Sequence, residues 1–292
     1  MSKYYANGDD LTAVANAIRT KGETSDPLAF PAGFVTAIEN IPTGGGDDPI
    51  TKELAEEKYS YTNNTVEIIW TTTVFSGTSY VEKITMNKLR RITKEQIFNS
   101  CASLKELHLP ALQEILVGNC IKSCSHLETL ELGPTLKMYY NAMYTFSNIG
   151  VTSFTLPPCS GTDNMSWLPE YFLANCANLT YAKISEGWTR VLSSAMRSNR
   201  AIKTIDLPST ITQIMDWSMC TCPQLDTVIC RATTVPTMSS TTGVYGVLAG
   251  SKIAAGTGYI YVPDDAVDAY KAATNWSTYA AQIKGLSELP TA

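Results

Sequence analysis

The sequence predicts an α/β repeat protein folded as a solenoid of about seven coils, and two regular spacings carry this prediction. The first is a series of apolar residues that recur at nearly constant distance along the chain. The second is a column of cysteine and asparagine residues that precedes them. Stacked units of constant length bury a continuous core between neighbours, so most residues of such a chain serve packing.

Seven apolar anchors open the expected strands, and successive anchors are 23, 23, 24, 28, 23 and 23 residues apart. They are Val81, Leu104, Leu127, Val151, Leu179, Ile202 and Leu225. Further apolar residues stand three and five positions after the anchors, as Leu107 and Leu109 do after Leu104. Both positions leave the same face of a strand, so this face points inward. The period lies in the leucine-rich range.

The second column stands three residues before the anchors. Its members are Cys101, Cys124, Asn148, Cys176, Asn199 and Cys222. We expect a buried ladder whose small side chains bond the backbone where the chain turns into each strand. A third column, which includes Phe98, Ile121 and Phe172, is expected to fill the convex side of the coils.

Residues 97–110, with the sequence IFNSCASLKELHLP, resemble the BspA-like leucine-rich repeat, whose pattern is A-F-x-x-C-x-x-L-x-x-I-x-L-P. The resemblance covers roughly residues 81–285. It departs from the pattern at Ala182 and Cys230, which replace large aliphatic residues, and in the long coil that follows Val151. It implies a right-handed solenoid with β-strands on the concave face, used for surface interaction and adhesion, and it brings no catalytic residues.

The sequence divides into five segments. We expect a helical hairpin at 1–42, a glycine-rich linker at 43–48, an N-terminal cap at 49–80, the solenoid at 81–232 and a C-terminal cap at 233–292. The last cap is expected to contain a strand at 259–263 and a helix at 265–274. Caps are needed because they cover the terminal core of a solenoid.

Residues 11–22, LTAVANAIRTKG, and 30–34, FPAGF, resemble the opening of tail or fibre proteins of phages and prophages of gut bacteria. An ordinary capping hairpin is the alternative. The sequence shows no secretory signal and no run of about 18 apolar residues for a membrane span. We therefore expect one of two cases: the protein stays inside the cell until it is assembled or released, or the sequence has been trimmed. Met1 is either the native start or an added residue.

Composition narrows the classes of partner and chemistry. A net charge of −5 without a basic run argues against nucleic acid and against an anionic membrane. No phosphate-binding loop or other cofactor motif is present. Cys120 and Cys124, with His126, lack the second pair of a zinc site, so we expect no metal and reduced thiols. We expect Cys220 to be exposed and reactive.

The outward strand positions are polar, mixed in charge and rich in threonine. We predict a binding patch on the concave face around His108, Glu131, Tyr181 and Lys183, with Trp167 at its edge. Trp167 ends an insertion, residues 157–167, of the kind that often binds partners in repeat proteins. The alternatives are an ordinary solvated sheet, and a Trp167 ring that folds back over the coil as core.

His108 stands beside two glutamates, and a histidine with carboxylates can act in acid–base catalysis. No nucleophile or metal ligand joins it in the sequence, so we expect a non-enzymatic interaction protein. We expect it to bind protein or cell-surface glycan as a phage or prophage tail-associated component that assembles through the hairpin. It would be found on the virion or at the cell surface. The alternative is an exported bacterial cell-surface adhesin whose signal sequence is missing here.

Overall fold

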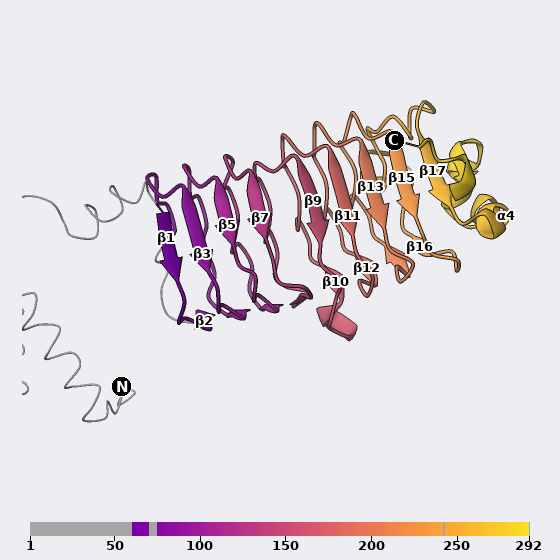
Figure 1. Cartoon of the computed structure of the whole chain (residues 1–292). Helices are drawn as coiled ribbons and strands as arrows, with labels where there is room; N and C mark the ends of the chain where they lie inside the picture. Colours follow the sequence, from indigo (N-terminus) through magenta and orange to yellow (C-terminus); the bar gives the residue numbers. More distant parts are fainter. Residues whose placement is uncertain (1–59, 70–74, 242, 292) are drawn as a thin grey trace, which may run out of the picture. The chain divides into compact units, whose positions relative to one another are not determined.

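The computed structural model describes residues 60–69, 75–241 and 243–291, all within one compact unit, Leu54–Ala292. The predicted helical hairpin, the linker and the start of the N-terminal cap lie outside the described residues. The described part is a parallel-strand β-solenoid of about nine turns (Figure 1). Seven coils were predicted. The difference arises because two strands outside the predicted repeats stack in register with them. One is β1 (Ser60–Asn63), which lies inside the predicted N-terminal cap, and the other is β17 (Tyr259–Val262), which was predicted as a strand of the C-terminal cap.

Each turn places one strand on what we call the front face, the face predicted to be concave. The first front sheet contains β1 (Ser60–Asn63), β3 (Lys83–Met86), β5 (Glu106–His108) and β7 (Thr129–Glu131). The second contains β9 (Ser153–Leu156), β11 (Tyr181–Ile184), β13 (Thr204–Leu207), β15 (Thr227–Cys230), β17 (Tyr259–Val262) and β18 (Ile283–Gly285). Within each front sheet, equivalent residues pair directly, so the inward columns predicted from the anchors run across its neighbouring coils.

Shorter strands form two further parallel sheets, which we call the return sheets. One contains β2 (Ile68–Ile69), β4 (Arg91–Ile92), β6 (Glu114–Ile115) and β8 (Lys137–Met138). The other contains β10 (Trp167–Leu168), β12 (Arg190–Val191), β14 (Gln213–Ile214) and β16 (Thr237–Met238). The core lies between the front and return sheets, where all seven anchors are at most 2% exposed. The predicted inward column is therefore confirmed.

The segments opposite the front face are irregular turns, so the α/β part of the prediction was wrong. Left-handed backbone positions recur there in each coil, as at Gln96, Asn119 and Ser194, with φ of 64°, 57° and 60°. An L-residue in this conformation interrupts a right-handed helix. Within the described residues, the only α-helix is α4 (Val267–Ala272). Phe98, Ile121 and Phe172 are nevertheless buried on this side as predicted.

The cysteine ladder is present, with one correction. The thiols of Cys101 and Cys124 donate to the backbone carbonyls of Phe75 and Phe98 in the preceding coil, at 2.9 and 2.8 Å. Cys176 and Cys222 make the equivalent bonds, and Asn199 replaces the thiol with its amide.

Asn148 does not belong to this ladder. It is exposed and left-handed, with φ of 57°, like Ser123, which precedes the ladder residue of its own coil. The buried Ile149 takes the ladder position instead. The prediction was wrong because the turn from the ladder to the anchor is one residue shorter in this coil.

The C-terminal cap covers the last coil with apolar residues. It comprises η2 (Gly243–Tyr245), η3 (Asp264–Ala266), α4, η4 (Trp276–Gln282), β18 and η5 (Leu286–Glu288). Trp276 and Tyr270 are buried and pack edge to face, with ring centroids 4.8 Å apart. The Trp276 indole donates to the Pro236 carbonyl at 2.7 Å, and the Tyr270 hydroxyl donates to the Ala232 carbonyl at 2.7 Å. The predicted closure of this end is confirmed.

Candidate recognition surface

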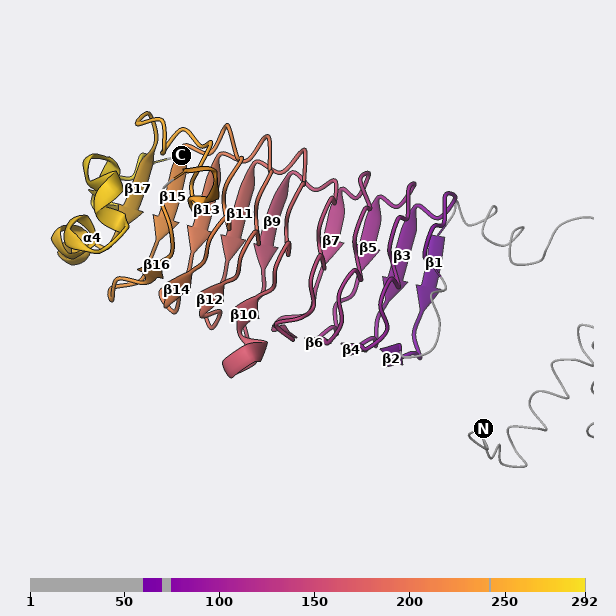
Figure 2. The ribbon, with the colours of Figure 1, turned by 180° about the vertical axis from the view of Figure 1, so that it is seen from behind.

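The front face is interrupted between β7 and β9. The first front sheet ends at β7, the second begins at β9, and no strand pairing joins the two within the described residues. Figures 1 and 2 show a wider space at this junction than at the others. The sequence carries a trace of this break, because the anchors Leu127 and Val151 are 24 rather than 23 residues apart.

The shortened turn gives a physical reason for the break. Two residues separate Cys124 from the anchor Leu127, whereas only Gly150 separates Ile149 from Val151. The two coils remain joined away from the front face, where the Ser123 amide donates to the Ser147 carbonyl at 2.9 Å. A bridge between Leu136 and Cys159 joins them on the return side. The coils are therefore splayed apart at the front alone.

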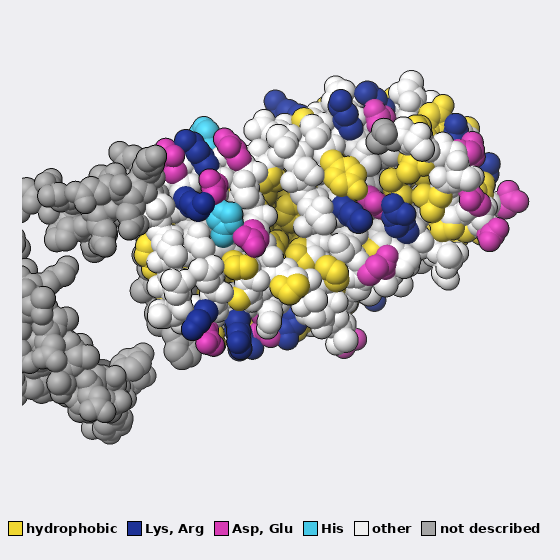
Figure 3. All heavy atoms as spheres, viewed as in Figure 1, with side chains coloured by type: hydrophobic (Ala, Val, Ile, Leu, Met, Phe, Trp, Pro, Cys, Tyr) yellow, Lys and Arg dark blue, Asp and Glu magenta, His cyan; other side chains and the backbone are white. Residues whose placement is uncertain are grey.

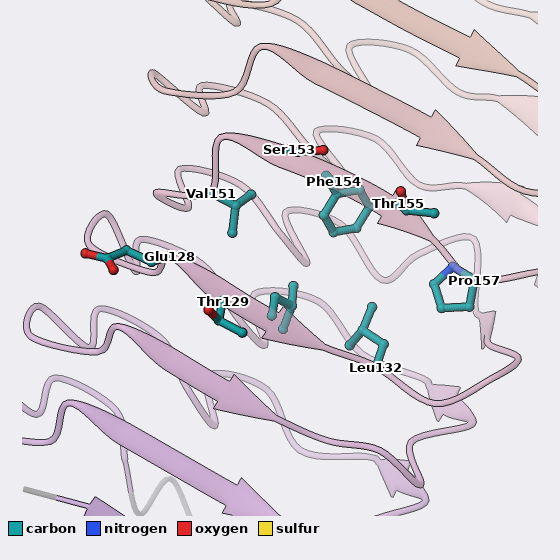
Figure 4. A pocket seen from close by; sticks show the side chains of 9 residues that line it. Glu128, Thr129, Leu132, Val151, Ser153, Phe154, Thr155 and Pro157 are labelled. Atoms are coloured by element: carbon teal, nitrogen blue, oxygen red, sulfur yellow. The ribbon is translucent and has the colours of Figure 1, made fainter.

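The splay opens a groove of about 350 Å³, which we call the β7–β9 groove. It is lined by Glu128, Thr129, Leu130, Leu132, Val151, Ser153, Phe154, Thr155 and Pro157. Figure 4 shows Glu128 at one end, Pro157 at the other, and the apolar side chains between them. Leu130 and Leu132 are only half-buried, although their counterparts in the preceding coil, Leu107 and Leu109, are fully buried. Core leucines thus reach the surface here.

His108 and Glu131 lie together on the first front sheet, beside the groove. The imidazole contacts the Glu131 carboxylate through Nδ1 at 2.8 Å and the Glu106 carboxylate through Nε2 at 3.0 Å. Burial alone would lower the pKa of His108, but the two hydrogen-bonded carboxylates outweigh it and raise that pKa. The Lys83 ammonium, 2.7 Å from Glu106, and then His108 lower the pKa of Glu106. The side chains form a fixed charged cluster.

Tyr181 and Lys183 lie on β11, with an ion pair nearby. Arg231 donates two hydrogen bonds to the Asp206 carboxylate, at 2.8 and 2.9 Å. Asp206 is 3% exposed although it occupies an outward position of β13. Burial, and then the charge of Asp206, raises the pKa of the Tyr181 hydroxyl. Lys183 is exposed between Thr155 and Asp206 in the strand register.

The predicted patch is therefore divided into two groups. His108 and Glu131 belong to the first front sheet, and Tyr181 and Lys183 belong to the second, with β9 and the groove between them. Figure 3 shows the front face with hydrophobic side chains in the hollow between its two parts. A ligand that contacts both groups must cross this hollow.

Trp167 is not part of the front face, so its predicted place at the edge of the patch was wrong. It lies on β10 in a return sheet, where the Arg190 guanidinium stacks over its ring at 4.4 Å. The Tyr140 ring packs against it at 5.9 Å, and Tyr140 in turn packs against Tyr139 at 4.8 Å. Trp167 is half-buried, and the two tyrosines are 40% and 37% exposed. Trp167 thus joins a separate aromatic cluster.

Cys220 is buried at 2% exposure, so the prediction of an exposed, reactive thiol was wrong. The backbone of residues 246–251 stacks against its turn, with hydrogen bonds from Met219 and Thr221 to Val247 and Ala249 at 3.1 and 2.7 Å. The repeat pattern decays in this segment, so it gave no sign that another turn covers Cys220. All eight cysteines are free thiols. Burial raises the pKa of Cys176 to about 12, which keeps that thiol protonated.

The described residues contain no group of three or more His, Cys, Asp or Glu side chains placed to hold a metal ion. In the same ranges, no helix combines the length and the apolar character needed to cross a membrane.

Sequence reasoning missed the groove and the Asp206–Arg231 pair. The 24-residue distance between the anchors Leu127 and Val151 indicated an irregular coil at this place. A sequence spacing does not reveal, however, that β7 and β9 are separated. Arg231 follows the core residue Cys230, and nothing in the pattern indicates that its guanidinium reaches back one coil to Asp206.

The fold defines the chain as a solenoid repeat protein built on parallel strands. A family model described as the BspA type leucine rich repeat region matches residues 57–161 and 140–241, in six copies. The chain therefore belongs to the BspA-type leucine-rich repeat family, as the cysteine ladder and strand pattern indicated. No curated protein matches the chain. Among solved structures, it is similar to that of the pneumococcal vaccine antigen PcpA, with 13% sequence identity over 78% of this chain and 77% of that chain and a TM-score of 0.30.

Proposed function

We propose that this chain is a non-enzymatic interaction protein that binds a protein or a cell-surface glycan through its front face. The β7–β9 groove carries the proposal, because it exposes core leucines between two groups of polar side chains. Ion pairs order His108 and Glu131 before any partner arrives, and the Asp206–Arg231 pair lies beside Tyr181. Side chains that are already ordered lose less entropy on binding, which favours recognition.

The proposal assigns no catalytic role to His108. Both of its ring nitrogens contact carboxylates, and within the described coils no serine, cysteine or lysine side chain hydrogen-bonds to the imidazole. General acid–base catalysis requires a reacting group within reach of the imidazole. We expect His108→Ala to change the free energy of unfolding, because it removes the two contacts to carboxylates, and we expect no enzymatic activity that the substitution could abolish.

Two biological settings fit this function. In the first, the chain is a tail-associated component of a phage or prophage, with residues 1–42 as its attachment segment. In the second, it is an exported bacterial adhesin. The first rests on the resemblance of residues 11–34, which lie outside the described residues. Flanking tail and lysis genes would favour the first setting, and an upstream signal sequence or a wall anchor would favour the second.

The test is a glycan-array and whole-cell binding screen of the parent chain with single variants. We expect Tyr181→Ala to weaken binding, because it removes a half-buried ring beside Lys183 from the front face. Trp167→Ala probes the aromatic cluster on the return side. Tyr80→Ala is the control, because Tyr80 is 48% exposed and belongs to neither group. Binding by Tyr181→Ala at the level of the parent and the control would refute the proposed front-face surface. A loss of binding by Trp167→Ala alone would place the site on the return side and would refute it too.

A further inference from the structure

Closed junctions of the front face share one pattern of backbone hydrogen bonds. At the β5–β7 junction, the amides of Glu128 and Thr129 donate to the Lys105 carbonyl at 2.8 and 2.9 Å. The Leu109 amide donates to the Glu131 carbonyl at 2.9 Å. The β11–β13 and β13–β15 junctions repeat the bonds that follow the anchor. The repeat therefore specifies which groups face each neighbouring strand.

The same pattern identifies the groups that face the β7–β9 groove. By equivalence, the amides of Thr152 and Ser153 should donate to the Glu128 carbonyl, and the Leu132 amide should donate to the Thr155 carbonyl. None of these three bonds is present in the described structure. Two strand edges with unmade backbone bonds thus face each other across the groove. Such edges are templates for another extended chain.

We propose that the β7–β9 groove binds an extended segment of a partner polypeptide, which adds as a β-strand to the free edges of β7 and β9. This inference rests on the proposed function, that the front face binds a partner. Alternating backbone donors and acceptors complement another backbone, which is the basis of strand addition. A glycan is the poorer fit, because the only aromatic ring in the groove, that of Phe154, is 3% exposed and offers no face for a sugar.

The lining indicates the side chains that the segment carries. Leu130 and Leu132 form an apolar floor, so every second side chain of the segment should be apolar. Glu128 is the only charged residue in the lining, and it stands exposed at one end. A lysine or arginine near that end would complement it. The volume lies near the small end of ligand sites, which suits a few residues of a longer chain.

The experiment selects peptides from a displayed random library on the parent chain and compares three proteins. Ser153→Pro removes the amide that faces the groove, and proline is tolerated at the first residue of a strand. Ser153→Ala is the matched control, because it removes the hydroxyl and keeps the amide. We expect the selected peptides to have alternating apolar residues and to bind Ser153→Pro about tenfold more weakly than they bind the parent. They should bind Ser153→Ala as tightly as the parent.

A second measurement does not depend on the fold of the proline variant. The selected peptide is resynthesised with N-methyl groups on alternate amides, which removes its backbone donors. We expect it to lose binding to the parent chain. Failure to select any peptide that discriminates Ser153→Pro from Ser153→Ala, or undiminished binding of the methylated peptide, would overturn the inference. If Tyr181→Ala still reduces cell binding in that case, the proposed function stands and only strand addition is refuted.

Discussion

Leu107 and Leu130 provide a matched pair of substitutions across the edge of the groove. They are partners in the strand register and occupy the same position of consecutive repeats. Leu107 is fully buried, whereas Leu130 is half-buried in the lining of the groove. Replacing each with alanine removes the same atoms, so any difference in the free energy of unfolding reports the difference in burial.

The expected magnitudes follow from that burial. Leucine has three more carbon groups than alanine, and at about 0.8 kcal/mol each their transfer from the core costs about 2.4 kcal/mol. The cavity left by Leu107→Ala raises the loss to about 3–5 kcal/mol. Leu130 is already partly hydrated, and water can enter the space it leaves. We therefore expect Leu130→Ala to cost about 1–2 kcal/mol.

The assay is urea unfolding followed by far-ultraviolet circular dichroism. The shift in midpoint gives the loss of stability as long as the slope of the transition stays that of the parent. Losses for the two variants that agree within about 0.5 kcal/mol would refute the reasoning. They would mean that β7 is covered in solution as fully as β5.

Three further predictions concern charge and thiols. Arg231→Ala should lower the free energy of unfolding in urea by about 2–4 kcal/mol, because it leaves the buried Asp206 carboxylate unpaired. The double variant Arg231→Ala with Asp206→Ala should recover part of that loss. A double variant that recovers nothing would contradict the pairing. Because the pKa of His108 is raised in the folded chain, the histidine stabilises the fold fully below its unfolded pKa of about 6.5, and this stabilisation is lost as pH rises through the folded pKa. The Tm of the parent should therefore fall more than that of His108→Gln across this pH range. Parallel curves of Tm against pH for the two proteins would refute this prediction. Thiol titration of the folded chain should modify Cys159, which is half-buried, and leave the buried Cys220 intact until unfolding, so rapid modification of Cys220 would contradict its burial.

The regular part of the fold could be predicted because each coil repeats the same packing problem. Leu104 and Leu127 are both fully buried, as their spacing requires, and Cys101 and Cys124 bond the backbone as small ladder residues should. One anchor was therefore enough to place its equivalents in the other coils.

What could not be predicted depends on contacts that the repeat does not specify. Asn148 was placed in the ladder because the distance to the anchor was assumed constant, and the shortened turn gives that position to Ile149. Cys220 is covered by a segment whose sequence no longer follows the repeat. Trp167 sits in an insertion, whose path is set by its own packing against Tyr140 and Arg190.

The candidate site was predicted in its parts but not in its arrangement. His108 and Glu131 were expected to lie close together because they occupy the same outward column of adjacent coils, and they contact each other at 2.8 Å. Tyr181 and Lys183 were assigned to the same patch by assuming one continuous sheet. The separation of β7 from β9 removes that continuity.

Amide hydrogen exchange of the unliganded chain, resolved by residue, tests the open front face most directly. The amides of Thr152 and Ser153 should exchange much faster than those of Glu128 and Thr129, their equivalents in the preceding coil, because only the latter donate to a neighbouring strand. Equal protection at the two pairs of residues would show that β7 and β9 are joined in solution and would contradict the account of the groove.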